Sequence, residues 1–250
     1  MGDGVAWTGG NDEVIKLAET IGARVYSADG GEINFPDNHL LNYGSTGHMF
    51  GDASLPIMQS CDLCIALGCY LLPEVYPYLG DIFKPETKVI HIDTDVDQIA
   101  KNHKVDISFV AKPATVIEAL NYKVMNLPDI WKTKANSRKE NLQKNSPVIK
   151  NDVDKLYELK PTYPSEKYDG KEFSMKSGYF IKTLSELLPK DHIIFDEALT
   201  NSPPINKYIP GLKPGDRMLT RGGSLGTGFP GAIAVSYTHL TLPTTSGVGV

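Results

Sequence analysis

The sequence predicts an α/β fold with two doubly wound units, in which parallel sheets are covered by helices on both faces. Short apolar runs, such as 63–68 and 87–92, alternate with segments whose apolar residues recur at helical spacing. These runs are continuously apolar, as expected for strands of a parallel sheet that is buried on both faces. A charged, proline-containing stretch at 123–176 separates two such regions, and we expect it to be a linker.

The first unit is expected to span residues 1–122. A helix is predicted at 10–22, because it starts at an Asn/Asp capping signal and stops at Gly22. Residues 30–47 predict a loop, since proline, asparagine, aspartate and glycine punctuate them. No strand precedes the first turn, so we expect the first strand of this unit to be missing and Met1 to be an internal methionine. The other predicted elements are strands at 23–28, 63–68, 87–95 and 106–111 and helices at 53–62 and 112–121.

The second unit is expected at 177–235, after a linker with one short helix between Ile130 and Leu142. Its predicted order is a helix, a strand, a second helix, then a strand, a glycine turn and the start of another helix. The segments are 177–189, 191–199, 201–209 and 216–235.

Composition excludes some classes of function. The formal net charge of −5 and the lack of a basic stripe argue against a nucleic-acid partner. No apolar run is long enough to span a bilayer, and no secretory leader pattern opens the chain, so we expect a cytoplasmic protein without a membrane partner.

Three cysteines lie close together in the sequence. Cys61 and Cys64 have the C-x-x-C spacing of a redox or metal pair, and Cys69 follows. No second pair of cysteines or histidines completes a zinc site, and the surrounding residues are strand formers. We therefore expect reduced thiols in a buried strand.

Two acidic motifs have both a structural and a functional interpretation. The triplet at 2–4, Gly-Asp-Gly, could be a phosphate or metal loop, but we favour a strand-to-helix turn. Asp93 and Asp95 end a predicted strand, where a carboxylate could bind a ribose hydroxyl or cap the helix that begins near Val96. The sequence leaves these two alternatives open.

A glycine-rich segment at 222–230 carries the strongest functional signal. Gly223, Gly226 and Gly228 allow close approach of the backbone to a ligand, and Pro230 suits the first turn of a helix whose free N–H groups favour an anion. Leu225, flanked by small residues, could project as a wedge or could simply pack in a core. Spacing alone does not separate these alternatives.

The sequence GGSLGTGFPGAIA at 222–234 closely resembles a segment of thiamine diphosphate-dependent enzymes of the acetolactate synthase and benzoylformate decarboxylase type. In that family it lies near the start of the C-terminal, cofactor-binding domain. The preceding IIFDEALTNSPPINKYI at 193–209 resembles the strand and loop that approach the diphosphate, and FDEALTNS is more similar to the benzoylformate decarboxylase type. Residues 2–122 are similar to the Rossmann-like central domain, with the motifs GDGV, IKLAETIGARVY, FPDNHLLNYGSTG, SCDLCIALG and TKVIHIDTD in the same order.

This resemblance implies a thiamine diphosphate site. Gly223 would offer its carbonyl to the aminopyrimidine, and Leu225 would be the wedge that bends the cofactor. Thr200 and Asn201 would lie near the diphosphate. The implied substrate is a 2-oxo acid, decarboxylated or ligated with the cofactor as electron sink.

The resemblance also implies that parts of the site lie outside this chain. The family's Mg²⁺ site is a second G-D-G with a downstream asparagine, and its activating glutamate belongs to an N-terminal domain, usually of a partner subunit. We assign neither to a residue here, so no catalytic residue and no metal ligand is predicted. The chain is expected to be an inactive fragment, with the second unit truncated, of an enzyme that forms a homodimer or homotetramer.

Two other hypotheses concern the first unit. It could be a nucleotide- or flavin-binding module without catalysis, in which Asp93 and the loop at 44–47 would matter more than Leu225. FAD is thus possible but not favoured. Alternatively, the unit binds nothing and serves as a scaffold.

The character of the sequence changes after Val235. The run SYTHLTLPTT closely resembles a translated sequencing adapter, and its β-branched residues and proline are expected to interrupt the helix from Thr238 onward. We therefore expect residues 236–250 to be a non-native tail.

Overall fold

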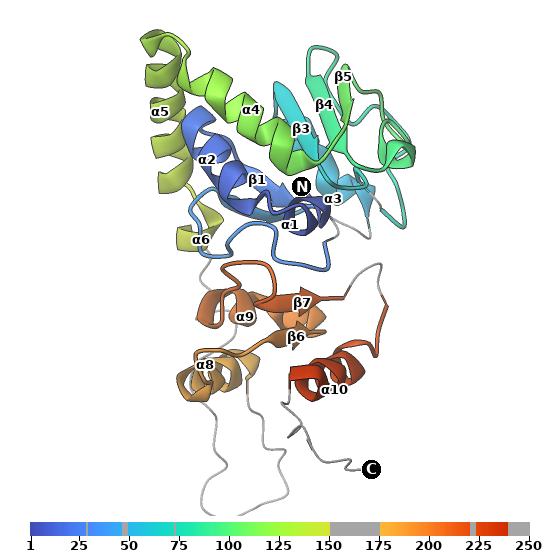
Figure 1. Cartoon of the computed structure of the whole chain (residues 1–250), viewed down its shortest axis with the longest axis vertical. Helices are drawn as coiled ribbons and strands as arrows, with labels where there is room; N and C mark the ends of the chain where they lie inside the picture. The colour runs from blue at the N-terminus through green and yellow to red at the C-terminus, as the bar shows by residue number, and fades with distance from the viewer. Residues whose placement is uncertain (29, 47–49, 73, 151–175, 221–223, 240–250) are drawn as a thin grey trace, which may run out of the picture.

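The computed structural model describes the whole chain apart from residues 29, 47–49, 73, 151–175, 221–223 and 240–250, with only the backbone at 238 and 239 (Figure 1). Its described strands form three sheets, and every strand pair in them is parallel. The predicted α/β class with parallel sheets is confirmed.

The first unit contains two sheets that flank the start of the chain. The Met1 ammonium donates to the Tyr26 carbonyl at 3.0 Å, and the Gly2 N–H donates to the Leu67 carbonyl at 3.0 Å. Met1 and Gly2 thus lie between the two sheets and tie their backbones together. One sheet pairs β1 (Val25–Ser27) with β2 (Asn42–Ser45), and the other has the order β3 (Leu63–Leu67), β4 (Lys88–Asp93) and β5 (Ile107–Val110).

Helices cover both faces of strands β3 and β4, whereas all four residues of β5 are exposed, so the expectation of burial on both faces is wrong for that strand. On one face Leu67 and Ile92 pack with Leu17 and Ile117, the latter two from α2 (Asn11–Ile21) and α4 (Pro113–Met125). On the other face Ala66 and Val89 pack with Met58 of α3 (Gly51–Met58). Neighbouring residues of β3 therefore point to opposite faces, as the continuous apolar run predicts. Two short helical segments complete the unit, α1 (Gly4–Trp7) and η1 (Val96–Gln98).

The prediction of a loop throughout 30–47 is wrong at β2. Residues 42–45 hydrogen-bond to β1, although Asn42 and Gly44 are turn-forming residues and Gly44 has φ +94°. The preceding Leu41 is fully buried and fixes this segment against the core. Pairing with a strand distant in sequence and burial of one side chain override the local turn signals.

A helix forms within the predicted linker and packs on the first unit. It is α5 (Asp129–Lys144), close to the expected helix between Ile130 and Leu142. Arg138 Nε donates to the Gly22 carbonyl at 2.9 Å, and Ala135 is buried. Gly22 ends α2 with φ +62°, and a Cβ there would lie 2.5 Å from the Ala135 carbonyl. The short α6 (Pro147–Lys150) follows.

The second unit contains the two-stranded sheet β6 (Ile194–Asp196) and β7 (Arg217–Leu219). Ile181, Ile205 and Ile209 form its small core. Ile181 belongs to the predicted helix α8 and Ile205 to the predicted helix α9. The helical segments are α8 (Ser177–Leu187), η2 (Leu199–Asn201), α9 (Ser202–Tyr208) and α10 (Gly228–His239).

The helix α10 corrects the expectation at the end of the chain. It continues past Val235 to His239, so Thr238 does not interrupt it. The propensity cost of a single β-branched residue, a few tenths of a kcal/mol, is too small to end a helix by itself. The proline and threonines at 243–245 lie outside the described residues.

The two units touch through the loop that follows β1. The Leu219 N–H donates to the Gly31 carbonyl at 2.9 Å, and the Asp37 N–H donates to the Gly211 carbonyl at 2.9 Å. A Cβ at Gly211 would lie 2.5 Å from Ile33 Cγ1, so the chains approach closely there. In Figure 1 the β6–β7 sheet lies directly below this loop.

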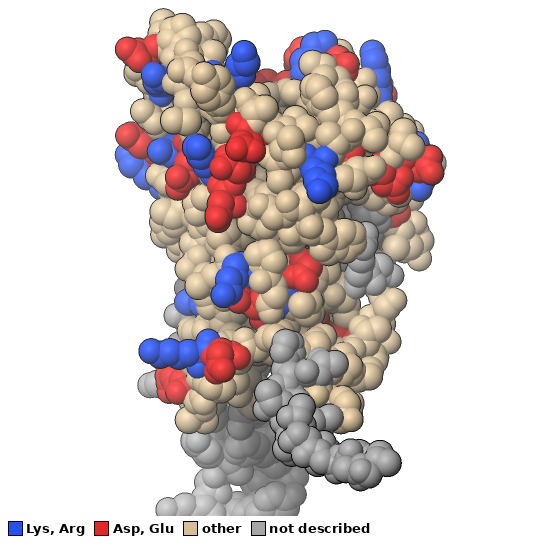
Figure 2. All heavy atoms as spheres, in the orientation of Figure 1, with Lys and Arg blue, Asp and Glu red and all other residues tan. Residues whose placement is uncertain are grey.

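The described surface shows no concentration of positive charge on the face seen in Figure 2. Lysine and arginine side chains are interspersed there with aspartate and glutamate. Among the described residues, none of the helices combines the length and the apolar character that crossing a membrane requires.

Candidate functional site

The candidate site lies where β6 and β7 end. The two strands pair in parallel, with Asp196 opposite Leu219, so their carboxyl ends meet at one edge of the sheet. This edge is where open α/β sheets bind ligands. The segment after β6 contains Thr200 and Asn201, and the segment after β7 leads to Leu225.

Thr200 and Asn201 lie in the exposed 3₁₀ turn η2 directly after β6. The Asp196 carboxylate shapes this turn, because its Oδ1 accepts from the Ala198 N–H at 2.9 Å and the Ser202 hydroxyl at 3.1 Å. Leu199 has φ +49°, a left-handed conformation that is unfavourable for a leucine. Strain of this kind persists only where surrounding contacts hold the backbone.

Leu225 projects from the loop before α10. Its side chain is 67% exposed, so the alternative that it packs in a core does not hold. Gly226 follows with φ +84°, which supports the expectation that glycine is needed there. The helix α10 begins at Gly228, two residues before Pro230, and Gly223 lies outside the described residues.

Glu197 joins these two segments, although the sequence assigned it no role. Its Oε1 accepts from the Thr227 N–H at 2.8 Å and from the Thr227 hydroxyl at 3.1 Å. Its Oε2 lies 3.0 Å from the position of a Cβ at Gly228. The N-terminus of α10 was expected to attract an anion, and a carboxylate of the chain itself occupies that position.

The backbone N–H groups of Gly228 and Thr227 hold the pKa of Glu197 below its usual value of 4.5. A lowered pKa means that the carboxylate stabilises the loop above about pH 4.5 and that this contribution is lost as the pH falls through the lowered pKa. We expect the Thr227 amide shift to titrate with a midpoint below pH 4.5 in NMR spectra. Glu197→Gln is the matched control and should abolish this transition; an unchanged transition in Glu197→Gln would contradict the assignment.

An apolar stripe runs along the exposed side of α10 and the preceding loop. Its members recur at every fourth residue, as on one face of a helix. They are exposed by 67%, 77%, 54% and 62% for Leu225, Phe229, Ile233 and Tyr237. Contiguous exposed apolar residues of this kind mark surfaces that bind a ligand or another chain.

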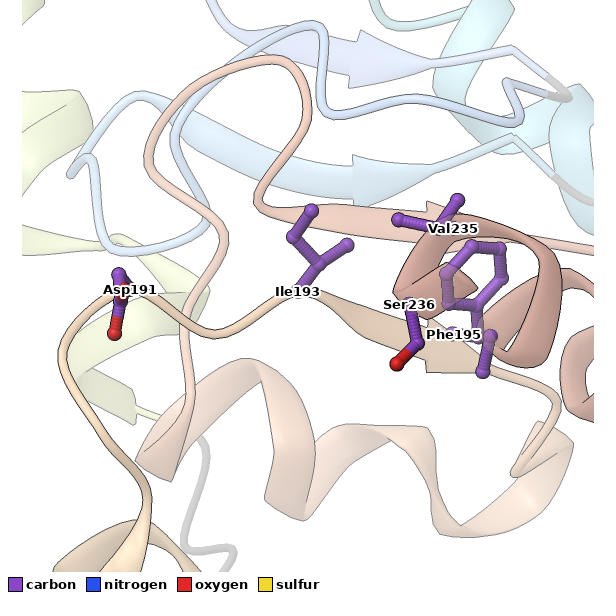
Figure 3. A pocket seen from close by; sticks show the side chains of 6 residues that line it. Asp191, Ile193, Phe195, Val235 and Ser236 are labelled. Carbon is purple, nitrogen blue, oxygen red and sulfur yellow. The ribbon is translucent and has the colours of Figure 1, made fainter. Parts of the chain in front are cut away.

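A cavity of about 410 Å³ lies elsewhere, between β6 and α10. Figure 3 shows Ile193 and Phe195 of the strand region near Val235 and Ser236 of the helix, with Asp191 farther along the preceding loop. None of Thr200, Asn201 and Leu225 lines this cavity. It lies away from the carboxyl edge and is not the predicted site.

The acidic motifs of the first unit have structural roles. Asp3 of the Gly-Asp-Gly triplet is buried and accepts from the Gly31 and Glu32 N–H groups at 2.9 and 3.0 Å. Asp93 accepts from the Asp95 N–H at 2.9 Å, and Asp95 caps η1 by accepting from the Asp97 N–H at 2.9 Å. These contacts favour the capping alternative for Asp93 and Asp95 and the turn alternative for the triplet.

The cysteine thiols are free, and Cys69 is buried. Burial raises the pKa of all three, that of Cys64 to about 12, so the thiolate is disfavoured. Among the described residues no group of three or more His, Cys, Asp or Glu side chains could hold a metal ion. The expectation of thiols in a buried strand holds for Cys64 alone, since β3 spans Leu63–Leu67 and Cys61 and Cys69 lie on either side of it.

Comparison with known proteins identifies relatives of this chain. The sequence profile of "Thiamine pyrophosphate enzyme, central domain" matches residues 1–120. A protein named "Probable acetolactate synthase large subunit" from Methanocaldococcus jannaschii is 29% identical over 93% of this chain and 37% of its own length. Acetolactate synthase of Mycobacterium bovis is 36% identical over 48% of this chain and 19% of its own length.

Solved structures agree with these sequence relatives. Benzoylformate decarboxylase from Polynucleobacter necessarius superposes with a TM-score of 0.68 at 17% identity, over 94% of this chain and 39% of that protein. This likeness concerns the fold. The chain spans less than half the length of these relatives. The profile, the sequence relatives and the shared fold lead to one conclusion: the chain belongs to the family of thiamine pyrophosphate-dependent enzymes.

Proposed function

We propose that this chain is part of a thiamine diphosphate- and Mg²⁺-dependent lyase or transferase that decarboxylates or ligates 2-oxo acids. The observation that supports this best is the joining of two segments at the carboxyl edge of the β6–β7 sheet. Glu197, directly after β6, accepts from the backbone and the hydroxyl of Thr227, two residues after Leu225, so the segments that follow β6 and β7 meet at this edge. The acetolactate synthase names of relatives that cover both units support the 2-oxo acid substrate.

Each residue has a proposed role. The hydroxyl of Thr200 and the amide of Asn201 would hold the diphosphate, and the exposed Leu225 would be the apolar side chain that supports the cofactor. Gly223, outside the described residues, offers its carbonyl to the aminopyrimidine. When bound, thiamine diphosphate supplies the electron sink for carbon–carbon bond cleavage. The donor set fits this cofactor, since it combines exposed hydroxyl and amide groups with one apolar side chain.

The proposed enzyme is a cytoplasmic homodimer or homotetramer. Two exposed apolar side chains of α10, Phe229 and Ile233, support the oligomer, because they are uncovered in the single chain. The three free thiols support a reducing compartment. Mg²⁺ would bind through ligands that we assign to no residue of this chain, and the 250-residue chain by itself is therefore proposed to be inactive.

A titration of the purified chain with thiamine diphosphate and MgCl₂ tests this proposal. We expect the Thr200, Asn201 and Thr227 amide resonances to shift, with a Kd of about 1 mM or weaker, near −4 kcal/mol. Leu225→Ala is the control variant and should remove the shift at Thr227 while the core resonances stay unchanged.

Three outcomes would contradict parts of the proposal. Saturation of the chain at micromolar concentrations of thiamine diphosphate would contradict the proposal that the chain by itself is inactive. Shifts elsewhere, or none at Thr200 and Asn201, would contradict the site. Saturable binding of FAD or ADP near Asp93, with no response to thiamine diphosphate, would favour the nucleotide-binding alternative.

A further inference from the structure

Three charged side chains, of which Arg217 and Asp196 are buried and Asp37 is partly buried, meet where the two units touch. Arg217 of β7 is 3% exposed, and its Nη2 lies 3.0 Å from Oδ2 of Asp37 in the loop after β1. Its Nε lies 3.9 Å from Oδ2 of Asp196 at the end of β6, and Asp196 is 4% exposed. One guanidinium therefore lies between two carboxylates, one from each unit.

The guanidinium of Arg217 has few hydrogen-bond partners for a buried charge. Within the described part of the chain, Arg217 Nε and Nη1 and Asp196 Oδ2 have no hydrogen-bond partner. When a buried charge lacks some of its hydrogen-bond partners, its position depends strongly on each of the opposite charges that lie near it. The Asp37 carboxylate is itself fixed, because it also accepts from the Gly211 N–H at 2.7 Å. Asp37 is thus the nearer carboxylate to Arg217, at 3.0 Å, and Asp196 lies at 3.9 Å.

The two oxygens of Asp196 face different neighbours. Oδ2 faces Arg217, whereas Oδ1 accepts from the Ala198 N–H at 2.9 Å and the Ser202 hydroxyl at 3.1 Å. Rotation of this carboxylate toward Arg217 would therefore release the turn that carries Thr200 and Asn201. The left-handed Leu199 in that turn makes it dependent on these hydrogen bonds.

We propose that Asp37, acting through Arg217 and Asp196, positions the Thr200–Asn201 segment for ligand binding. Asp37 is a positioning residue, since it contacts Arg217 and the Gly211 N–H and is proposed to act on the segment through Arg217 and Asp196. Through this chain of charges, the contact between the two units determines the geometry of the ligand-binding segment. The identity of the ligand as a diphosphate rests on the function proposed above; the positioning does not.

Hydrogen exchange of the Ala198 amide, measured by NMR on the full chain without cofactor, tests this inference. Asp37→Asn should accelerate that exchange about 5-fold or more, the lower end of typical coupling between sites. The Leu219 amide, which bonds to Gly31 across the units, should change less than about 2-fold, because the units stay docked. Asp37→Glu, which retains the charge but displaces it, should give an intermediate acceleration and serves if Asp37→Asn does not fold.

Glu32→Ala is the matched control. It removes a different contact between the units, the bond from the Gly215 N–H to Glu32 Oε2 at 3.0 Å, and leaves Arg217 and Asp196 in place. We expect it to leave Ala198 exchange unchanged. Equal acceleration in both variants, or acceleration of Leu219 as large as that of Ala198, would show that Asp37 only docks the units. Unchanged Ala198 exchange in both Asp37 variants would overturn the proposal, whether or not the chain binds thiamine diphosphate.

Discussion

Replacing Arg217 with methionine should lower the free energy of unfolding by about 3–5 kcal/mol, the usual cost of removing one partner from a buried ion pair. Asp37 and Asp196 would then remain as two carboxylates in a buried contact with no cation between them. Chemical denaturation followed by circular dichroism measures the effect.

Lys88→Met is the control for this prediction. Lys88 Nζ lies 2.9 Å from Asp106 Oδ1, but the lysine side chain is 69% exposed. An exposed pair of this kind contributes at most about 1 kcal/mol. Adding Asp37→Asn to Arg217→Met should recover part of the lost stability, because one uncompensated charge is removed. If Arg217→Met and Lys88→Met lowered the free energy of unfolding by similar amounts, the result would contradict a stabilising role for the Asp37–Arg217–Asp196 cluster.

Replacing Gly68 with alanine should destabilise the first unit by about 2–5 kcal/mol, through left-handed strain and overpacking together. Gly68 has φ +52°, and a Cβ there would lie 2.6 Å from Gly4 Cα. The two backbones also hydrogen-bond, since the Gly4 N–H donates to the Gly68 carbonyl at 3.0 Å. Neither backbone can move away without breaking this contact between the Gly-Asp-Gly turn and the end of β3.

Gly9→Ala isolates the contribution of the backbone conformation. Gly9 has φ +71°, but nothing lies within 4 Å of its Cβ position. We therefore expect Gly9→Ala to cost only about 1–2 kcal/mol, the strain of a left-handed alanine. The difference between the two variants, read from denaturation midpoints, measures the steric overlap at Gly68. Equal effects of the two substitutions would show that the overlap is relieved at no cost.

These two predictions concern contacts in different parts of the chain. The Gly4–Gly68 contact closes the edge of the first unit where a Rossmann-like domain could bind a nucleotide. The Arg217 cluster connects the first unit to the turn with Thr200 and Asn201. Both contacts are made between segments more than 60 residues apart in the sequence.

The sequence by itself determined most elements of the fold. The apolar runs at 63–68 and 87–92 predicted buried parallel strands, because such runs fit no half-exposed sheet. The glycines around Leu225 predicted an unusual turn before a helix, and Gly226 has the positive φ that such a turn requires. These features depend on residues that are neighbours in the sequence, so the local sequence is enough to predict them.

Only the tertiary structure decided the strand β2, the continuation of α10 to His239, the clamp between Glu197 and Thr227 and the Asp37–Arg217–Asp196 cluster. Strand β2 forms against turn-forming residues because β1 supplies its hydrogen-bond partners. Glu197 lies 30 residues from Thr227, and Arg217 lies further still from Asp37, so no sequence spacing marks either pair. Charges and hydrogen bonds become specific only when folding brings distant groups within about 3 Å and removes the water between them.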